Sequence, residues 1–361
     1  MATHLNVTGT EYVTINMETA IGGTSGTAIL IPVLPGTFKM TENRENIFDD
    51  ARRGIDTMNF GSYRGVESSE ITWDGVIQEG NATVHPVIGF LLHNLMSSTS
   101  TRAQIESLVL SDHRIQLGQL VNYMTVTHAS LGAGGGLARQ AADCRVSEIT
   151  IRWNAGEGRL EYSVTLTGQA PTLVTEALAT DHTGNNFMAW RGRLDIMNIV
   201  PHLRVISGEW TISRELTPWY ATNNTRAYAD IYAGPLNAQC SAVLELDAGL
   251  ADYSKVVAFE TATNQTEFTM IWSNDDKLEG SDDEVVTSRR FALSMSNASL
   301  GGQAVEIDNS NINNRLLLTA VGLNAGAGTL MSDGNAVTAS LNSPVQAQIF
   351  SVGTNPYPAL I

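Results

Sequence analysis

Residues 146–168 read VSEITIRWNAGEGRLEYSVTLTG, and this stretch decides the fold class. Apolar and polar side chains alternate on either side of segment 154–158, whose Asn, Gly and Glu residues are typical of a turn. Strict alternation is typical of half-buried strands, so the stretch predicts a hairpin with one apolar and one polar face. Residues 64–79 alternate in the same way, which places Ile71 and Asp74 on opposite faces of another strand.

The composition also favours a mainly β protein. Charged residues make up 16% of the chain, below the usual quarter, and Thr, Ser, Asn and Gly take their place. These residues are common on polar strand faces and in turns. With 361 residues, the chain is too long for one ordinary core and suits two domains.

One order of predicted elements occurs twice. The first half has a strand at 36–41, a charged loop, a strand at 64–79, a helix at 85–96, a strand at 120–129 and the hairpin at 145–168. The second half has a strand at 203–216, a polar loop, a strand at 227–236, a helix at 248–259, a strand at 267–273 and paired strands at 289–299 and 314–323. A repeated order is typical of a duplicated module. We therefore predict two tandem modules, residues 1–175 and 187–361, with a linker from about Pro171 to Asn186.

The net charge of −16 is spread over both halves of the chain. Nucleic-acid binding requires Lys and Arg to replace condensed counterions, so we expect that this acidic protein does not bind nucleic acid tightly. Two interpretations of the acidity stay open. It could line a surface along which a polyanion slides without sticking, or it could serve solubility alone.

The two cysteines, Cys144 and Cys240, are too few for a secreted disulfide scaffold. We expect two buried thiols, with a bridge between them as the open alternative. The N-terminus shows no signal-peptide pattern, and no run of 18 apolar residues occurs. The expectation is a soluble protein made in a reducing cytoplasm.

The predicted loop at 41–63 is the most charged stretch of the chain. It is longer than a hairpin needs, and long loops are usually functional or disordered. A solvated flap and a contact arm for a neighbouring subunit both remain open. The candidate inter-subunit residues are Glu42, Arg44, Glu45, Asp49, Asp50, Arg52, Arg53 and Asp56.

The sequence contains no pattern typical of a catalytic, cofactor-binding or metal-binding site. The seven histidines form no zinc motif. Segment 132–137, GAGGGL, has Leu137 at the third glycine position of a dinucleotide loop and lacks the surrounding βαβ units. Carboxylates such as Glu70 and Asp74 are expected on the wet face of a strand rather than as a glycosidase pair. We therefore predict a protein that is not an enzyme, with no catalytic residues, no cofactor and no metal.

Several short segments occur in a characteristic order. In the first half they are ETA at 18–20, IPVLP at 31–35, RGVE at 64–67, PVIGFLL at 86–92 and YSVTLTG at 162–168. In the second half they are VISGEWTI at 205–212, IYAGPL at 231–236, VLEL at 243–246 and SPVQAQIF at 343–350, followed by Tyr357. In order and spacing, the first set resembles the tail tube proteins (major tail proteins) of long-tailed bacteriophages. The second set resembles the same family again.

This resemblance implies a β-sandwich module with one short flanking helix, whose inner strands close with those of neighbouring modules into a barrel around a lumen. Sixfold rings of modules would stack into a hollow tube, assembled around a tape measure protein and later traversed by the genome. Two modules per chain would reduce each ring to three chains. The implied partners are the chain itself, the tape measure protein, the baseplate initiator and the tail terminator, with DNA in transit and no membrane. The implied location is the virion tail, after assembly in the bacterial host cytoplasm.

A lumen that DNA traverses needs a polar face without a cationic stripe. We hypothesise that the lumen-facing residues include Glu70, Asp74, Glu148, Glu161 and Glu209. The alternative is that the polar strand faces point to the outside solvent.

Two other functions stay open. The first is another virion protein of related fold, such as a tail terminator, a baseplate-ring protein or a decoration protein. The second is a β-sandwich carbohydrate-binding or carbohydrate-active protein, which should show an exposed aromatic platform. The tryptophans are instead predicted to lie on apolar strand faces.

Overall fold

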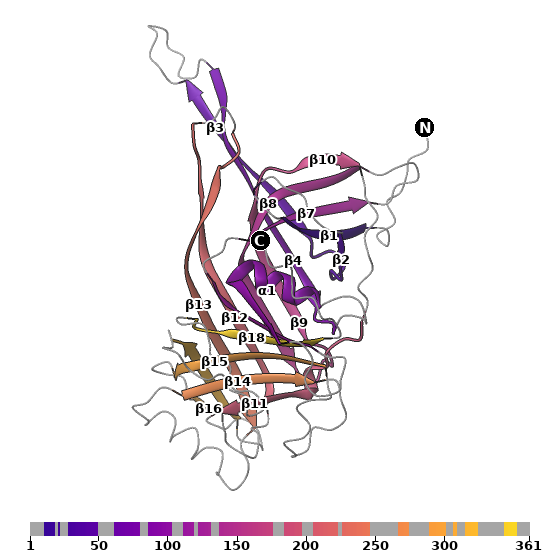
Figure 1. Ribbon diagram of the computed structural model, residues 1–361, viewed down its shortest axis with the longest axis vertical. Coiled ribbons are helices and arrows are strands. Elements are labelled where there is room, and N and C mark those ends of the chain that lie inside the picture. The colour runs from indigo at the N-terminus through magenta and orange to yellow at the C-terminus, as the bar shows by residue number, and fades with distance from the viewer. Residues whose placement is uncertain are drawn as a thin grey trace.

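The computed structural model describes residues 11–18, 21, 28–49, 61–79, 86–102, 111–118, 122–130, 137–175, 184–196, 205–222, 226–245, 266–273, 289–300, 306–308, 315–323 and 343–351. These residues form eighteen strands, one α-helix and one short 3-10 helix (Figure 1). The prediction of a mainly β protein is confirmed.

The elements follow one another closely along the chain. The first half contains β1 (Glu11–Glu18), β2 (Ile29–Ile31), β3 (Lys39–Asp49), β4 (Gly61–Val76), α1 (Val87–Met96), β5 (Ser97–Arg102), β6 (Ser111–Leu117), β7 (Tyr123–Ser130), β8 (Leu137–Asn154), β9 (Glu161–Gly168) and β10 (Thr172–Thr175). The second half contains η1 (Ala189–Arg191), β11 (Gly192–Ile196), β12 (Val205–Trp219), β13 (Asp230–Glu245), β14 (Thr266–Ser273), β15 (Arg290–Leu300), β16 (Glu306–Asp308), β17 (Arg315–Gly322) and β18 (Gln346–Ser351).

The strands make two antiparallel sheets. The smaller sheet has the order β2-β1-β7-β8-β10 and lies at the upper right of Figure 1. Only the part of β8 up to Cys144 belongs to it, because from Arg145 onward β8 pairs with β9. One strand therefore ties the smaller sheet to the larger one.

The larger sheet has two parts. The first part, which we call the long sheet, has the order β3-β4-β9-β8-β12-β13-β17. The next strand position beyond β17 is shared by β16 and the last residues of β15, which both pair with β17. The two halves of the chain meet where Glu148–Asn154 of β8 pairs with Ser207–Ser213 of β12.

The second part, which we call the short sheet, has the order β11-β14-β15-β18-β6-β5. Its strands cross the long sheet steeply in Figure 1. It also joins the two halves, because residues 111–115 of β6 pair with residues 347–351 of β18. Two separate strand pairings therefore connect the first half of the chain to the second.

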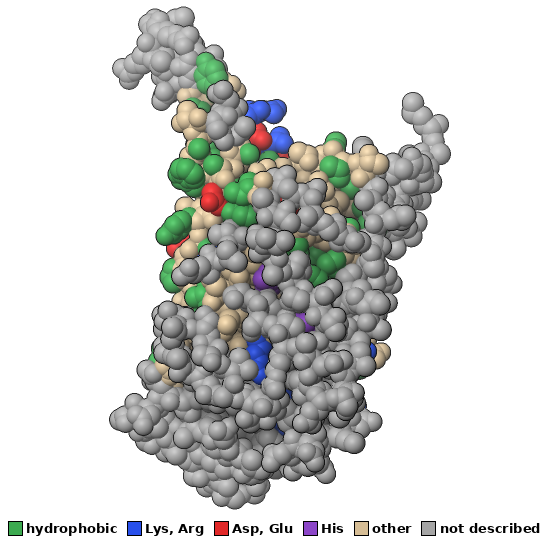
Figure 2. Space-filling model, in the orientation of Figure 1, with side chains coloured by type: hydrophobic (Ala, Val, Ile, Leu, Met, Phe, Trp, Pro, Cys, Tyr) green, Lys and Arg blue, Asp and Glu red, His purple; other side chains and the backbone are tan. Residues whose placement is uncertain are grey.

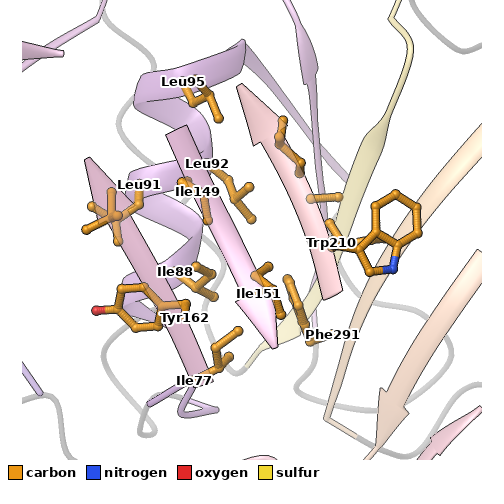
Figure 3. Close-up of a cluster of buried hydrophobic side chains, with 14 of the residues drawn as sticks. Ile77, Ile88, Leu91, Leu92, Leu95, Ile149, Ile151, Tyr162, Trp210 and Phe291 are labelled. Carbon is orange, nitrogen blue, oxygen red and sulfur yellow. The ribbon is translucent and has the colours of Figure 1, made fainter. Parts of the chain in front are cut away.

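The core lies between the long sheet and the elements that cover it. All ten residues of α1 are buried, which is expected of a helix that is apolar on nearly every side. Ile88, Leu91, Leu92 and Leu95 of α1 lie over the part of the sheet that carries Ile149, Ile151 and Tyr162 (Figure 3). The cluster continues through Tyr162, Trp210 and Phe291, which come from both halves. The predicted helix at 85–96 is confirmed, and it covers a sheet as expected.

The alternation that decided the fold class is confirmed for most residues, although Thr150, predicted on the polar face of β8, is buried. In β9, buried and half-buried residues alternate over its whole length. In β4, Ile71 and Trp73 are buried, whereas Glu70 is exposed. Cys144 and Cys240 are buried free thiols, and no disulfide joins them.

The predicted loop at 41–63 is wrong for residues 41–49 and 61–63. These residues extend β3 and β4, which pair as far as Asp49 opposite Gly61. The two strands project beyond the rest of the molecule in Figure 1. Both faces of this projecting part meet water, so its sequence lacks the apolar alternation that signals a strand.

Other predictions changed in extent. The strand predicted at 227–236 is β13, which continues to Glu245. Part of the predicted linker, Thr172–Thr175, forms β10 and pairs with β8. The predicted helix at 248–259 lies outside the described residues. The two-module division at 175 and 187 stays a prediction.

The junction between the halves depends on a glycine, which yields a testable prediction. Gly208 of β12 lies opposite Trp153 of β8, and a Cβ there would lie 2.3 Å from the Trp153 ring and 2.4 Å from the Ser241 carbonyl oxygen. Because the carbonyl is backbone and cannot swing away, Gly208→Ala should destabilise the chain by about 1–3 kcal/mol. Chemical denaturation measures this change. Gly156→Ala is the control, since its Cβ would meet no atom closer than 3.5 Å; equal effects of the two variants would contradict the account.

Candidate assembly surface

One face of the long sheet is mainly polar, with the exposed apolar side chains of Leu317 and Val321 on β17, and we call it the wet face. It is the face opposite the core, reached by every second residue of each strand. Its side chains include Lys39, Thr41, Glu70, Thr72, Asp74, Glu148, Arg152, Glu161, Ser163, Thr165, Glu209, Thr211, Gln239, Ser241 and Thr319. The strand registers therefore bring all five predicted acidic residues onto one face of one sheet. Whether that face lines a lumen stays a prediction.

Hydrogen-bonded side chains cross this face from strand to strand. Asp74 of β4 accepts a hydrogen bond from the Ser163 hydroxyl of β9 at 2.5 Å. Arg152 of β8 pairs with Glu209 of β12 at 2.8 Å, across the junction between the two halves. Arg152 lies opposite Glu161 on its other side, and Glu161 pairs with Arg159 at 2.7 Å. Arg152 thus lies between two carboxylates, Glu161 and Glu209.

The wet face carries more acid than base among the side chains that the structure describes. Its five predicted carboxylates stand against Lys39 and Arg152, with Arg159 in the turn before β9. Such a face offers a polyanion no row of cations to replace its counterions.

The projecting β3–β4 hairpin holds part of the predicted contact arm. Glu42 forms ion pairs with Arg44 at 2.8 Å and with Arg139 of β8 at 2.7 Å. Glu45 lies in a bulge and packs against Gly65, where a Cβ would come within 2.8 Å of its carboxylate. Asp49 ends β3, whereas Asp50, Arg52, Arg53 and Asp56 lie outside the described residues.

Exposed apolar side chains on the hairpins were not anticipated from the sequence. Ile47, Phe48 and Tyr63 are exposed near the end of the β3–β4 hairpin. Trp219 and Tyr232, at 61% and 75% exposed, stand on the neighbouring β12–β13 hairpin. Figure 2 shows hydrophobic side chains among polar ones over this projecting part of the molecule. Charge had marked the region as a contact arm, but short apolar stretches such as residues 47–48 were the missed signal.

Two tryptophans correct the prediction that all of them lie on apolar strand faces. Trp73, Trp153, Trp210 and Trp272 are buried, but Trp190 and Trp219 are exposed. Trp190 stacks on Arg191 in η1, with 4.7 Å between the guanidinium carbon and the ring centroid. Trp219 ends β12, far along the chain from η1. Trp190 lies within a three-residue 3-10 helix and Trp219 at the end of a strand, and strand periodicity does not predict burial at either place.

The two hairpins are also tied to each other and to the smaller sheet. The Glu67 N–H donates to the Arg226 carbonyl at 3.1 Å, and the Arg226 side chain pairs with the Glu67 carboxylate at 3.1 Å. The Arg145 guanidinium donates to the Ile231 carbonyl at 2.8 Å and lies 5.8 Å from the Tyr123 ring centroid. The start of β13 is therefore fixed against the first half by buried polar contacts.

The carboxyl groups of Glu18 and Asp143 form a buried pair close to Arg145 and Tyr228. Glu18 is 1% exposed, and its Oε1 accepts hydrogen bonds from the Thr125 hydroxyl and from the Asp143 N–H at 3.0 Å. Asp143 has a positive φ of 53°, and its carbonyl accepts a hydrogen bond from the Tyr228 hydroxyl at 2.9 Å. Burial, and next the hydrogen bond with the Asp143 carboxyl, raise the pKa of Glu18 to about 7.

The described residues contain no group of three or more His, Cys, Asp or Glu residues that could hold a metal ion, and their two cysteines are buried. Burial raises the pKa of the Cys144 and Cys240 thiols, which makes them poor nucleophiles. Within the same ranges, α1 is too short to cross a bilayer.

The comparison with protein families identifies the family of the chain. The model of the phage tail tube protein family matches residues 11–342, nearly the whole chain. The chain belongs to the phage tail tube protein family. The resemblance found in the sequence is thereby confirmed, and the tail tube role makes the protein a structural component of the phage tail. No curated protein matches the chain.

The buried carboxyl pair gives a pH-dependent prediction for this tail tube protein. Glu18 binds a proton near pH 7 when folded but near pH 4.5 when unfolded, so stability present below pH 4.5 is lost as the pH rises through 7. Glu18→Gln imitates the protonated carboxyl. It should therefore match the parent at pH 4.5 and exceed its stability at pH 8, by up to about 3 kcal/mol.

Denaturant titrations of the unassembled chain across this pH range measure the difference. Glu148→Gln, on the exposed wet face, is the control for loss of one negative charge. A Glu18→Gln variant that is less stable than the parent at pH 8 would contradict the assigned protonation.

Proposed function

We propose that three copies of this chain form a ring, that rings stack into the hollow tail tube, and that the phage genome passes through it. The long sheet is the observation that carries the proposal. It runs without interruption through both halves, is polar on one face, and ends at β3 on one side and at β15 and β16 on the other. Exposed strand edges invite pairing with another chain, and closure into a barrel removes them.

The strand pairings support a duplicated module. In the first half, β1 pairs with β7, β7 with β8, β8 with β10, β8 with β9, β9 with β4, and β4 with β3. In the second half, β11 pairs with β14, β14 with β15, β15 with β18, β15 with β17, β17 with β13, and β13 with β12. The same six pairings in the same chain order favour two tandem β-sandwich modules.

A local irregularity supports the same conclusion. The β3–β4 pairing has a bulge in which Gly65 and Val66 of β4 both lie opposite Glu45. The β12–β13 pairing has one in which Gly234 and Pro235 of β13 both lie opposite Glu215. In each case, a Cβ on the glycine would meet the glutamate of the bulge. Matching bulges are specific features, because an extra residue in a strand shifts every later side chain.

Two modules per chain give a ring of six modules from three chains. In such a ring the wet face would line the lumen, since the opposite face is covered by α1 and the short sheet. Glu70, Asp74, Glu148, Glu161 and Glu209 would then keep DNA from binding to the wall. The projecting hairpins, with their exposed aromatic side chains, would contact neighbouring subunits.

The remaining partners follow from the tail tube role. The tube would assemble in the bacterial host cytoplasm around a tape measure protein, from a baseplate initiator to a tail terminator, and the virion tail would be its final location. This chain would contribute no catalysis and would contact the genome without specific recognition.

Native mass spectrometry of purified rings tests the stoichiometry. We expect a mass of three chains, because two modules come from each chain. Rings of six chains would contradict the proposal, and so would a chain that stays monomeric at every concentration and salt.

Charge reversal tests the lumen assignment. Phage particles assembled with Glu70→Lys/Glu148→Lys should still build tubes, but their DNA ejection should be slowed because the wall would gain cations. Leu173→Lys/Thr175→Lys, on exposed positions of β10, is the matched control. Equal ejection rates for the two variants, measured by dye uptake on released DNA, would place the wet face outside the lumen.

A further inference from the structure

We propose that the ring closes by antiparallel pairing of β16 of one copy with β3 of the next, with Asp308 opposite Lys39. The register would be the one that joins β8 to β12 inside the chain. This inference rests on the ring proposed above and names the contact that closes it. It follows from the registers of the two halves and from the charges at equivalent positions.

The bulges fix which residues of β3 and β12 are equivalent. Aligning Arg44-Glu45 with Arg214-Glu215 places Lys39 at the position of Glu209. The partner strands agree, because Lys39 lies opposite Thr72 and Glu209 lies opposite Ser241. Those two partners are themselves equivalent when Gly65 is aligned with Gly234.

The opposite edge follows in the same way. In the alignment of β4 with β13, Ile71 is equivalent to Cys240. Ile71 pairs with Leu166 of β9, and Cys240 pairs with Ala320 of β17. Leu166 is therefore equivalent to Ala320, and two residues further along Gly168 is equivalent to Gly322. Glu161 is then equivalent to Arg315. Arg152 lies opposite Glu161, and Asp308 lies opposite Arg315, so Asp308 holds the position of Arg152.

Inside the chain, this row of the sheet alternates in charge. Glu161, Arg152 and Glu209 follow one another on β9, β8 and β12, with signs minus, plus, minus. The Arg152 and Glu209 side chains meet at 2.8 Å. Opposite charges directly across a strand pair favour that register.

The equivalent row at the open edges carries every sign reversed. Arg315 and Asp308 follow one another on β17 and β16, and Lys39 of β3 would complete the row as plus, minus, plus. Lys39 is exposed, and no ion pair described in the structure involves it. If β3 paired with β16 of a second copy, Asp308 would supply the opposite charge to Lys39, as Arg152 does for Glu209.

Neighbouring positions in the same register are also compatible. Met40 would lie opposite Ile307, as Trp210 lies opposite Ile151, and both pairs are apolar. Thr41 would lie opposite Glu306, as Thr211 lies opposite Thr150. A slip by one residue would set charged positions against apolar ones.

The reversal of signs also disfavours the wrong junction. If β3 of one copy met β8 of another, Lys39 would face Arg152, and if β16 met β12, Asp308 would face Glu209. Like charges across a strand pair are destabilising. The two kinds of junction would therefore alternate around the ring, and each would join a first module to a second module. Junctions between two first modules or between two second modules are disfavoured.

Cysteine pairs test the register directly. In Thr41→Cys/Glu306→Cys, oxidation of assembled rings should link neighbouring copies, giving covalent dimers and trimers on denaturing gels. Thr41→Cys/Ile307→Cys is the control, because adjacent residues of a strand point to opposite faces. The native cysteines are buried and should add little background. Rings that form but link only in the control pair would overturn the register.

Charge reversal tests the ion pair. Lys39→Glu and Asp308→Lys should each raise the concentration for half-maximal ring formation by about tenfold or more, since every junction of the ring would carry a like-charge pair. Lys39→Glu/Asp308→Lys restores opposite charges and should recover most of that loss. The inference would be overturned if the single variants formed rings at the same concentration as the parent. It would also be overturned if the double variant needed as high a concentration as the single variants.

These outcomes separate the two proposals. If the parent chain forms no rings, the proposed function fails and no cross-link is expected in any variant. If the parent forms three-chain rings but the cysteine and charge variants behave otherwise, the function stands and this closing contact is wrong.

Discussion

The main-chain pairing of β8 with β12 is the interaction on which the rest of the structure depends. A strand edge presents unpaired N–H and C=O groups, and here the edge of the first half is satisfied by the edge of the second. The pairing turns two short runs of strands into one long sheet with a single wet face. Without it, the five carboxylates would lie on two separate surfaces.

Several side chains serve this one junction. Gly208 leaves room for the Trp153 ring on the core side, and Arg152 and Glu209 meet on the wet side. Away from the junction, β6 and β18 connect the halves a second time. The buried contacts of Arg145 and Tyr228 fix the start of β13 against the smaller sheet. The two halves of the chain are therefore joined at several points.

Much of the long sheet could be predicted from the sequence, because one of its faces is buried and the other is wet. That condition produces the alternation seen at 146–168. The helix α1 was predicted from a different signal, its run of apolar residues. The β3–β4 hairpin was missed beyond residue 41, since a ribbon with water on both sides shows no alternation. The pairing of β6 with β18 joins residues more than two hundred positions apart, and local patterns carry no information about such contacts.

The candidate site was predicted in composition but not in arrangement. Acidic residues on wet strand faces were foreseen, and the registers gather them on one face. The row through Lys39 could not be found in the same way, because the equivalence of Lys39 with Glu209 emerges only when the bulges of the two hairpins are aligned. Bulges depend on local backbone geometry, which the spacing of apolar residues does not record.

A reconstruction of the assembled tube by electron cryo-microscopy, at a resolution that separates strands, tests the central claim most directly. The account predicts a continuous barrel in which the long sheets of three chains are joined edge to edge. Glu70, Glu148 and Glu209 would face the axis. A tube whose lumen is lined by the short or smaller sheets, or whose long sheets do not touch at their edges, would contradict it.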